Sequence, residues 1–264
     1  MTDPEPILLD TTREGVAVVT LNRPEIHNAF NPDVIERLGD VFDDLAKQDG
    51  VRVILLEGAG KSFSAGADLA WMRAASNYTE SENKEDAGDL AKMLHRLRAV
   101  PQPTIALVHG AAMAGGLGLV AACDIAIATK QALFGLSEVR LGLIPAVISP
   151  YVIEAIGVRN ARRYFLTAER FGADEALRIG LVHMVVEDRP ALAQAVEDVV
   201  DAILQGSPAA VASAKRLIDA NIAGFPDAEL RGVTSRMIAE ARASDDAKEG
   251  LAAFFEKRKP RWAK

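Results

Sequence analysis

The sequence predicts an α/β protein in which strand, glycine-bearing loop and helix follow one another repeatedly, with a purely helical region at its C-terminal end. Short β-branched runs such as Val16–Val19 and Val53–Leu56 alternate with stretches whose apolar residues recur at helical spacing. Glycine-bearing segments connect strand to helix at 58–68 and at 109–118. The last part of the chain contains four helical patterns and no strand pattern: 190–205, 208–223, 227–242 and 245–258.

The first elements are two strands and a capped helix. Ile7–Leu21 predicts two strands that turn at Arg13-Glu14-Gly15, because Glu-Gly supplies a turn before the run Val16–Val19. Asn31 is expected to cap the first helix, with Pro32 at its first position. The apolar residues of this helix recur at helical spacing: Val34, Leu38, Val41, Phe42 and Leu45.

The middle of the chain predicts the same unit twice, which suggests stacked ββα turns. The first unit is a buried strand at 53–56, a loop at 58–68 and a helix at 82–98 that Pro101 and Pro103 end. The second begins with a strand at 104–108 and continues as a loop at 109–114, a helix at 115–122 and a strand at 125–128.

A boundary near residue 200 separates the expected α/β core, 1–200, from a helical region, 201–264. The late helices carry more apolar residues than so small a region can bury, among them Leu251, Phe254 and Phe255. These side chains either pack back onto the core or form a homo-oligomer interface.

Composition excludes several classes of protein. The chain has 264 residues, 49% of them hydrophobic, with 30 Lys and Arg against 37 Asp and Glu. It is too apolar for disorder, and its longest uncharged stretch, 99–123, contains two prolines and four glycines, which argues against a membrane span. The net charge of −7 argues against a nucleic-acid partner.

Targeting and metal signals are absent from the sequence pattern. Cys123 is the only cysteine, and the four histidines, at 27, 95, 109 and 183, lack metal-binding spacing. The opening residues MTDPEP lack the basic and apolar regions of a secretory signal. We therefore expect a cytoplasmic protein without a metal site.

Three segments combine the features that acyl chemistry needs. Small residues at 58–68 and 109–118 let a ligand approach the backbone, and the helix after each loop leaves its first amides unpaired. Two such loops facing each other would supply two N–H donors to one thioester oxygen and so stabilise an enolate. The third segment, 134–145, embeds Glu138 among Phe134, Leu136, Val139 and Leu141. Desolvation there should raise the pKa of Glu138 and suit it to acid–base work.

These segments resemble the crotonase superfamily, which contains the enoyl-CoA hydratases and isomerases. The resemblance covers nearly the whole chain in order. The matching residues are Leu21–Phe30, Phe63–Leu69, His109-Gly110, Ala114–Gly116, Cys123-Asp124, Phe134–Pro145, Ala173–Val182 and Phe254–Arg258.

The resemblance implies a spiral of ββα units with a C-terminal helical trimerisation region, assembled as trimers or as hexamers built from two trimers. It places the oxyanion-hole amides at Ala67 and Gly115, with Glu138 as the acid–base residue. Coenzyme A arrives as part of the acyl-CoA substrate, so no separate cofactor is expected. The positions matching the family's CoA-binding residues are Arg23, Glu25, His27, Ser64, Ala65, Asp68, Leu69, Gly116 and Lys257.

One departure from the family pattern leaves several activities open. Hydratases with two glutamates carry the first in the helix after the second glycine loop, where this chain has Gly118. The leading expectation is reversible hydration of a 2,3-unsaturated acyl-CoA. The alternatives are a Δ3,Δ2-enoyl-CoA isomerase, another crotonase activity that uses Glu138 alone, and a non-catalytic acyl-CoA-binding protein. A dehydrogenase also stays open, because Gly116–Ala121 fits a dinucleotide fingerprint weakly.

A finer resemblance concerns the substrate. Asp68–Arg73, Ser137–Gly142 and Ile144–Pro150 are similar to the methylglutaconyl-CoA and carboxygeranoyl-CoA hydratase branch, which acts in leucine and terpene breakdown. The usual Lys after the Ala-Asp-Leu motif is replaced, with Ala70 and Trp71 in its place. The resemblance implies a branched or carboxylated acyl chain in fatty-acid or branched-chain amino-acid metabolism. Candidate pocket walls are Trp71, Met72 and Tyr78, which are equally consistent with core packing.

Overall fold

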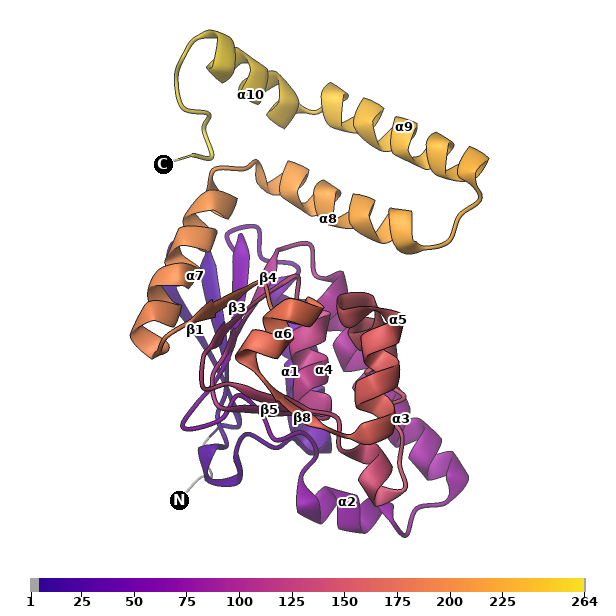
Figure 1. Cartoon of the computed structure of the whole chain (residues 1–264). Helices are drawn as coiled ribbons and strands as arrows, with labels where there is room; N and C mark the ends of the chain where they lie inside the picture. The colour runs from indigo at the N-terminus through magenta and orange to yellow at the C-terminus, as the bar shows by residue number, and fades with distance from the viewer. Residues whose placement is uncertain (1–4, 264) are drawn as a thin grey trace. The chain divides into compact units, whose positions relative to one another are not determined.

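The computed structural model describes residues 5–263, and these divide into two compact units. The first unit contains the described residues up to Val100 together with Thr104–Val196. The second contains Pro101–Pro103 and the described residues from Glu197 onward. The boundary expected near residue 200 falls inside helix α7 (Arg189–Leu204), which crosses the division (Figure 1).

A six-stranded sheet forms the centre of the first unit, with strand order β1-β2-β3-β4-β6-β9. The first two strands are antiparallel and the remaining pairs are parallel. Because a parallel sheet is covered on its faces, its inner strands are almost continuously apolar, and all five residues of β4 are buried. The strands are β1 (Ile7–Arg13), β2 (Val16–Leu21), β3 (Val53–Gly58), β4 (Thr104–Val108), β6 (Ile125–Thr129) and β9 (Met184–Val186).

A second sheet has three strands, of which β5 follows β4 in the chain and β7 follows β6. Its order is β5 (Ala111–Met113), β7 (Leu133–Gly135) and β8 (Arg170–Gly172), with β5 parallel to β7. This corrects the expectation that 109–114 is a loop throughout. The strand is only three residues long, and its sequence, Ala-Ala-Met, carries no β-branched residue to mark it.

The first three helices of this unit begin with side-chain caps that the sequence supplies. Asn31 accepts a hydrogen bond from the Val34 amide at the start of α1, as expected. Thr79 and Glu82 form a capping box that begins α3 two residues before the expected start. The remaining segments are α2, which was not expected, α4, α5, α6 and two 3-10 helices. Their bounds are α1 (Pro32–Leu45), α2 (Leu69–Ala75), α3 (Glu80–Ala99), α4 (Gly115–Ala122), α5 (Ser149–Thr167), α6 (Ala173–Ile179), η1 (Pro24–Ile26) and η2 (Glu138–Leu141).

The core of this unit is aliphatic and joins the sheet to the helices. Helix α1 packs on α3, and α4 packs on α5, which lies beside it in Figure 1. Phe42, Leu38 and Ile54 are among the fully buried side chains. Each such side chain contributes roughly 1.5–3 kcal/mol to folding. The α/β class of repeated strand–loop–helix units is thus confirmed.

Asp124 of the Cys123-Asp124 motif has a structural role at the start of the strand that leads into the second glycine loop. Asp124 accepts hydrogen bonds from the Thr104 amide (2.8 Å) and hydroxyl (2.9 Å) through Oδ2. In return, the Thr104 hydroxyl oxygen accepts from the Asp124 amide at 2.9 Å. These bonds join the starts of β4 and β6 and so hold the strand that leads into the glycine loop.

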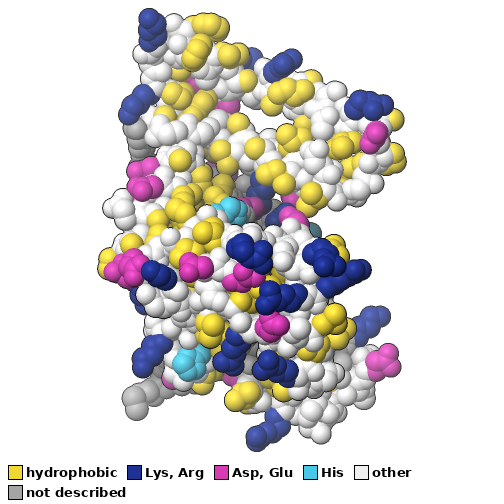
Figure 2. Space-filling view, viewed as in Figure 1, with side chains coloured by type: hydrophobic (Ala, Val, Ile, Leu, Met, Phe, Trp, Pro, Cys, Tyr) yellow, Lys and Arg dark blue, Asp and Glu magenta, His cyan; other side chains and the backbone are white. Residues whose placement is uncertain are grey.

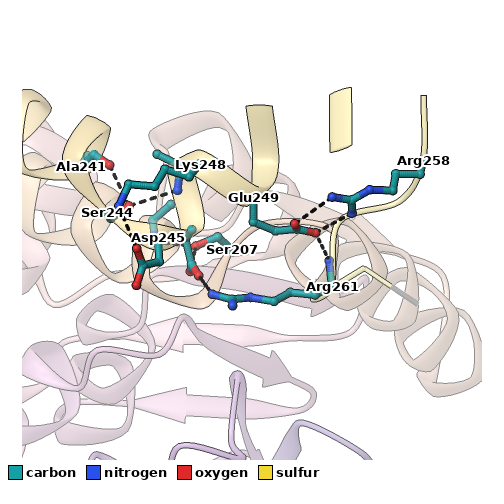
Figure 3. Close-up of polar contacts among 11 residues, drawn as sticks. Ser207, Ala241, Ser244, Asp245, Lys248, Glu249, Arg258 and Arg261 are labelled. Carbon is teal, nitrogen blue, oxygen red and sulfur yellow. Dashed lines mark hydrogen bonds and ion pairs between the residues drawn. The ribbon is translucent and has the colours of Figure 1, made fainter. Parts of the chain in front are cut away.

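The second unit consists of helices, as expected: α8 (Pro208–Ile222), α9 (Asp227–Ala243) and α10 (Asp245–Phe255). A polar cluster holds the chain after α10 (Figure 3). Glu249 binds the Arg258 guanidinium at 2.7 and 2.9 Å and accepts from the Arg261 amide at 2.9 Å. Arg261 reaches Asp246 at 2.5 Å, and Asp246 also accepts from Ser207, the cap of α8.

Apolar side chains gather on the surface of the second unit (Figure 2). Phe254 and Phe255 are about three-quarters exposed, at 76% and 75%. Other exposed residues on these helices are Leu217, Ile218, Ile222, Ile238 and Leu251. An apolar groove of about 560 Å³ lies between α8 and α9, lined in part by Leu217, Met237 and Ile238. Within the described part of this unit, helix packing leaves these side chains uncovered.

Candidate functional site

Two loops that follow neighbouring strands pair with each other. Loop 59–68 leaves β3, and segment 109–114 leaves β4, the strand beside it. The Phe63 amide donates to His109 O at 2.9 Å, and the Ser64 amide donates to Ala111 O at 3.0 Å. The Met113 amide donates back to Ser64 O at 2.9 Å. These bonds form a short parallel ladder, so the two glycine segments of the sequence lie against each other.

Ala67 and Gly115, the expected oxyanion-hole residues, lie at the end of this ladder. Within residues 5–263, neither backbone N–H donates a hydrogen bond to another group of the protein. A Cβ added to Gly66 would lie 3.4 Å from the Gly115 nitrogen, so the backbone just before Ala67 runs close to Gly115. Both residues are half-buried. The structure therefore brings the two amides to neighbouring positions, and their joint action on one oxygen remains a prediction.

The backbone before Gly115 is held in an unusual conformation. Ala114 has φ 47° and ψ −117°, a region that residues with a Cβ seldom occupy. Its amide donates to Gly135 O at 2.8 Å. Ala114 is the N-cap residue of α4, so Gly115 is the first helical residue and its N–H has no partner within the helix. Strain of this kind clusters at functional sites.

Glycines in α4 allow the close approach of the two loops. A Cβ on Gly115 would lie 2.4 Å from Phe30 Cζ, and a Cβ on Gly116 would lie 2.5 Å from Ser64 O. Gly116 and Gly118 are both buried residues of α4, with other segments packed against them. The weak dinucleotide fingerprint falls in this helix rather than at the tight strand-to-helix turn that binds a pyrophosphate.

Glu138 is the first residue of η2 and is a half-buried carboxyl group. Its Oε2 atom is buried and has no hydrogen-bond partner in the described part of the chain. Burial raises the pKa of Glu138 above its ordinary value. Phe134 and Leu136 are buried nearby in sequence, whereas Leu141 is exposed. An unpartnered, desolvated carboxyl group is typical of an acid–base residue.

The chain path places Glu138 near the two loops. Gly135 accepts from the Ala114 amide, next to Gly115, and Glu138 follows three residues later. Three residues span at most about 11 Å, so the backbone of Glu138 lies within that distance of Gly135. The acid–base candidate and the α4 amides thus belong to one region of the first unit.

Two of the predicted CoA-binding side chains are bound to each other. Arg23 pairs with Asp68 at 3.0 Å and donates to Ala29 O at 2.9 Å. Asp68 also caps α2 by accepting from the Ala70 amide at 2.7 Å. This ion pair joins the η1 segment to the end of the glycine loop. In this structure both side chains organise the backbone around Ala67.

The other predicted CoA-binding positions differ in accessibility. Ser64 is fully buried, and its hydroxyl donates to Asn28 O at 2.9 Å. The Ala65 amide donates to His27 O at 2.9 Å, while Leu69 is exposed. The side chain of Glu25 is exposed as well. Lys257 is an exposed residue of the second unit, with φ 54°, and its part in CoA binding remains a prediction.

Asn28 is the site residue that sequence reasoning missed. It is buried, and its side-chain amide donates to Ala59 O at 2.8 Å and to Ser62 O at 2.7 Å. Its Oδ1 accepts from the Arg23 amide at 3.0 Å. With φ 54° it occupies the left-handed region, which Asn tolerates better than most residues. The sequence could have indicated this role, because Asn28 closely follows a short turn that begins with Pro24, and Asn is common in the left-handed conformation.

Replacing Asn28 with Asp is expected to lower the free energy of unfolding by about 2–4 kcal/mol, because two carbonyl oxygens lose their donor and face a buried carboxyl group. Chemical denaturation at neutral pH measures this loss. Asn77→Asp is the matched control, since the Asn77 amide makes one long hydrogen bond, 3.3 Å to Arg73 O, on an exposed helix end. Equal losses in the two variants would contradict the organising role of Asn28.

The described residues 5–263 contain no group of three or more His, Cys, Asp or Glu side chains arranged to hold a metal ion. Over the same residues, every helix is too short or too polar to cross a membrane.

Comparisons with known proteins agree with this geometry. The model of the family "Enoyl-CoA hydratase/isomerase" matches residues 11–264. A crystal structure of an enoyl-CoA hydratase from Shewanella pealeana is 45% identical, covers 97% of this chain and 96% of its own, and superposes with a TM-score of 0.93. The short-chain-enoyl-CoA hydratase of Clostridium acetobutylicum is 36% identical, with 94% of each chain covered.

The crotonyl-CoA hydratase of Syntrophomonas wolfei is 34% identical, with 97% of this chain and 96% of that protein covered. These matches run through both compact units rather than through one motif. They confirm the superfamily resemblance and the expectation of an enzyme of the hydro-lyase type. The chain belongs to the enoyl-CoA hydratase/isomerase family.

Proposed function

We propose that the protein adds water reversibly to a 2,3-unsaturated acyl-CoA thioester. The observation that carries this proposal is the pair of N–H groups at Ala67 and Gly115, which lie on touching loops and lack an acceptor within the described residues. Preorganised donors of this kind stabilise the negative charge that develops on a thioester oxygen. Glu138, three residues beyond Gly135, supplies the proton-transferring group.

In the hydration direction the Glu138 carboxylate accepts a proton from water while the water oxygen bonds to the β-carbon. The π electrons of the double bond move toward the thioester, and the Ala67 and Gly115 amides bind the resulting enolate oxygen. Protonated Glu138 then returns its proton to the α-carbon, which restores the carboxylate and completes the hydroxyacyl-CoA. Water is consumed, and the enzyme ends in its starting protonation state.

The substrate itself supplies coenzyme A, so this reaction uses no separate cofactor. The segment around η1 and the loop 64–69 are the proposed CoA contacts, through Arg23, Glu25, His27, Ser64, Ala65, Asp68 and Leu69, together with Gly116 and Lys257. Because the Arg23–Asp68 pair is internally satisfied, we expect these two residues to shape the loop and the backbone around them to meet the ligand.

The isomerase alternative has a specific observation in its favour. Helix α4 carries no titratable side chain, so Glu138 would act alone, and a lone proton shuttle is sufficient to move a double bond. Incubation with a 2-enoyl-CoA and a 3-enoyl-CoA, followed by ultraviolet absorbance of the conjugated thioester, separates the two reactions. Loss of the conjugated absorbance from the 2-enoyl-CoA, with formation of hydroxyacyl-CoA, supports hydration.

Two other results would replace the proposal. Appearance of conjugation from the 3-enoyl-CoA without hydration would assign an isomerase. Binding of acyl-CoA thioesters without turnover over a panel of chain lengths would assign a binding protein. In either case the Ala67 and Gly115 amides would still hold the thioester oxygen, and only the proton transfers would differ.

A branched or carboxylated acyl chain is the finer proposal. Trp71 packs against the core and donates to Asp86 at 3.0 Å, while Met72 and Tyr78 are half-buried on and after α2. Trp71 and Met72 lie on the helix that follows the Ala67 loop and Tyr78 lies just beyond it, and in this proposal the three side chains limit the acyl chain. Comparing kcat/KM for crotonyl-CoA with kcat/KM for methylglutaconyl-CoA tests this preference. We expect methylglutaconyl-CoA to have the higher kcat/KM, as an enzyme of a cytoplasmic breakdown pathway for such acyl groups would.

Assembly as a trimer, or as a hexamer of two trimers, is proposed from the exposed apolar residues of the second unit. Phe254, Phe255 and Ile218 are more than half exposed on helices whose other faces are packed or polar. Burial of such residues between subunits removes apolar area from water. Sedimentation velocity measures the mass directly, and a monomer at micromolar concentration would contradict the proposal.

The pH dependence of activity follows from the environment of Glu138. Because burial raises its pKa above the ordinary 4.5, the carboxylate form that accepts the proton is lost at a higher pH than for an exposed glutamate. We expect kcat/KM for hydration to fall as the pH is lowered through this raised pKa. A rate that stays constant down to pH 4.5 would contradict the role of Glu138 as the base.

A further inference from the structure

The side chain of Ile148 fills the space that a side chain at position 118 would occupy. A Cβ built on Gly118 would lie 2.2 Å from Ile148 Cγ2 and 2.8 Å from Ile148 Cβ. Non-bonded carbon atoms do not approach this closely, so with isoleucine at 148 a side chain at 118 would force the backbone to shift. Both residues are buried, and Ile148 is only 3% exposed.

This contact cannot be relieved by a change of rotamer. The Ile148 Cβ atom is attached directly to the backbone, so rotation about χ1 moves Cγ2 and leaves Cβ in place. Ile148 immediately precedes α5, and its carbonyl accepts from the Val152 amide at 3.1 Å. Because α5 packs on α4, any side chain on Gly118 would require a shift of one helix relative to the other.

Besides Glu138, the segments η2, α4, 142–150 and the first turns of α5 carry no carboxyl group that lacks an ion-pair partner. Gly118 is one turn beyond Gly115 in α4, a helix composed of Gly, Leu, Val and Ala. The segment from Gly142 to Pro150 contains no titratable residue either. On η2 the only charged residue besides Glu138 is Arg140, which is exposed. On the first turns of α5, Glu154 is bound to Arg98 at 2.5 Å. Tyr151 is half-buried there, and burial raises the pKa of its phenol, so it stays protonated and is no second carboxylate base.

We propose that Ile148 and Gly118 are a matched pair that closes the active site with a hydrocarbon wall one turn from the oxyanion-hole amide, so that Glu138 carries both proton transfers. This inference rests on the proposed function for its chemistry, but the packing part of it does not. Ile148 acts here as a positioning residue, since it keeps a second acid out rather than transferring a proton.

A double-mutant cycle tests the pairing. Gly118→Ala is expected to lower the melting temperature in the wild-type background, and this loss should disappear in the Ile148→Gly background, where both clashing carbons are gone. Gly88→Ala is the matched control, because Gly88 also lies inside a helix but has nothing within 4 Å of a new Cβ. The control should not lose stability. Equal losses from Gly118→Ala in both backgrounds would overturn the pairing.

Moving the carboxylate from position 138 to position 118 tests whether Ile148 keeps a second acid away from the reacting carbons. Glu138→Gln should be nearly inactive. The triple variant Gly118→Glu/Ile148→Gly/Glu138→Gln should have a kcat at least tenfold higher than its control, Gly118→Gln/Ile148→Gly/Glu138→Gln. A folded triple variant that is no more active than its Gln counterpart would show that this space does not reach the reacting carbons. That result would overturn the proposal.

A smaller change covers the case in which the triple variant does not fold. In Ile148→Gly/Glu138→Gln, added formate can enter the emptied space, and we expect it to raise kcat at least fivefold more than it does in Glu138→Gln with Ile148 intact. Equal responses in the two variants would overturn the proposal. If wild-type protein turns over no acyl-CoA, the proposed function fails instead, and the melting-temperature cycle still decides the pairing.

Discussion

Glu138→Gln is expected to reduce kcat by about 10²–10⁴-fold, the range that general acid–base catalysis supplies. The substitution keeps the shape of the side chain but removes its ability to take a proton from water and return it to the α-carbon. The affinity for coenzyme A should be unchanged, because CoA binds through the η1 segment and the glycine loop in our proposal. Steady-state kinetics with an enoyl-CoA and calorimetric CoA binding measure the two effects.

The stability of the same variant separates a catalytic role from a structural one. Since the pKa of Glu138 is raised in the folded protein, the folded state is penalised once the pH exceeds the ordinary 4.5 and the carboxylate forms. Glu138→Gln should therefore be at least as stable as wild type at pH 7, with an advantage that vanishes at low pH. A variant that is both fully active and less stable would remove Glu138 from the mechanism.

Gly66→Ala is expected to lower kcat by about 10²–10³-fold, comparable to the loss of an oxyanion-hole donor. Gly66 has φ 87°, and a new Cβ would lie 2.8 Å from Met113 O and 3.4 Å from the Gly115 nitrogen. The added carbon would push apart the two loops that carry the Ala67 and Gly115 amides. Kinetics with an enoyl-CoA, at a substrate concentration well above KM, measure this effect on the chemical step.

The control for backbone strain is Gly157→Ala. Gly157 has φ 71° at the kink of α5, and a new Cβ there has nothing within 4 Å. Both variants suffer the cost of a left-handed residue with a side chain, on the order of 1–3 kcal/mol. Only Gly66→Ala should lose activity beyond its loss of stability. Equal losses of kcat would show that strain, rather than the separation of the amides, is responsible.

Local features of the chain were predictable because local interactions create them. Asn31 and Pro32 begin α1 because the side-chain cap and the preset φ of proline act within a few residues. The glycine loops were recognisable because glycine permits conformations and approaches that other residues do not. The embedding of Glu138 was also visible, although Leu141 turned out to be exposed.

Features that depend on distant residues could not be predicted in this way. Asn28 organises a loop more than thirty residues away, through hydrogen bonds to Ala59 and Ser62. The strand β5 exists because Ser64 and Gly135 belong to neighbouring segments that offer it partners. The contact between Gly118 and Ile148 likewise joins two segments thirty residues apart, and only a folded chain reveals it.

The contact between Gly118 and Ile148 has an evolutionary consequence, because it makes the two positions epistatic. A mutation that introduces an acid at 118 meets the isoleucine, and a mutation that first shortens the isoleucine leaves a cavity at the junction of α4 and α5. Each single step is disfavoured, although the two together are compatible. An acid at position 118 is therefore accessible to this fold only when both residues change together.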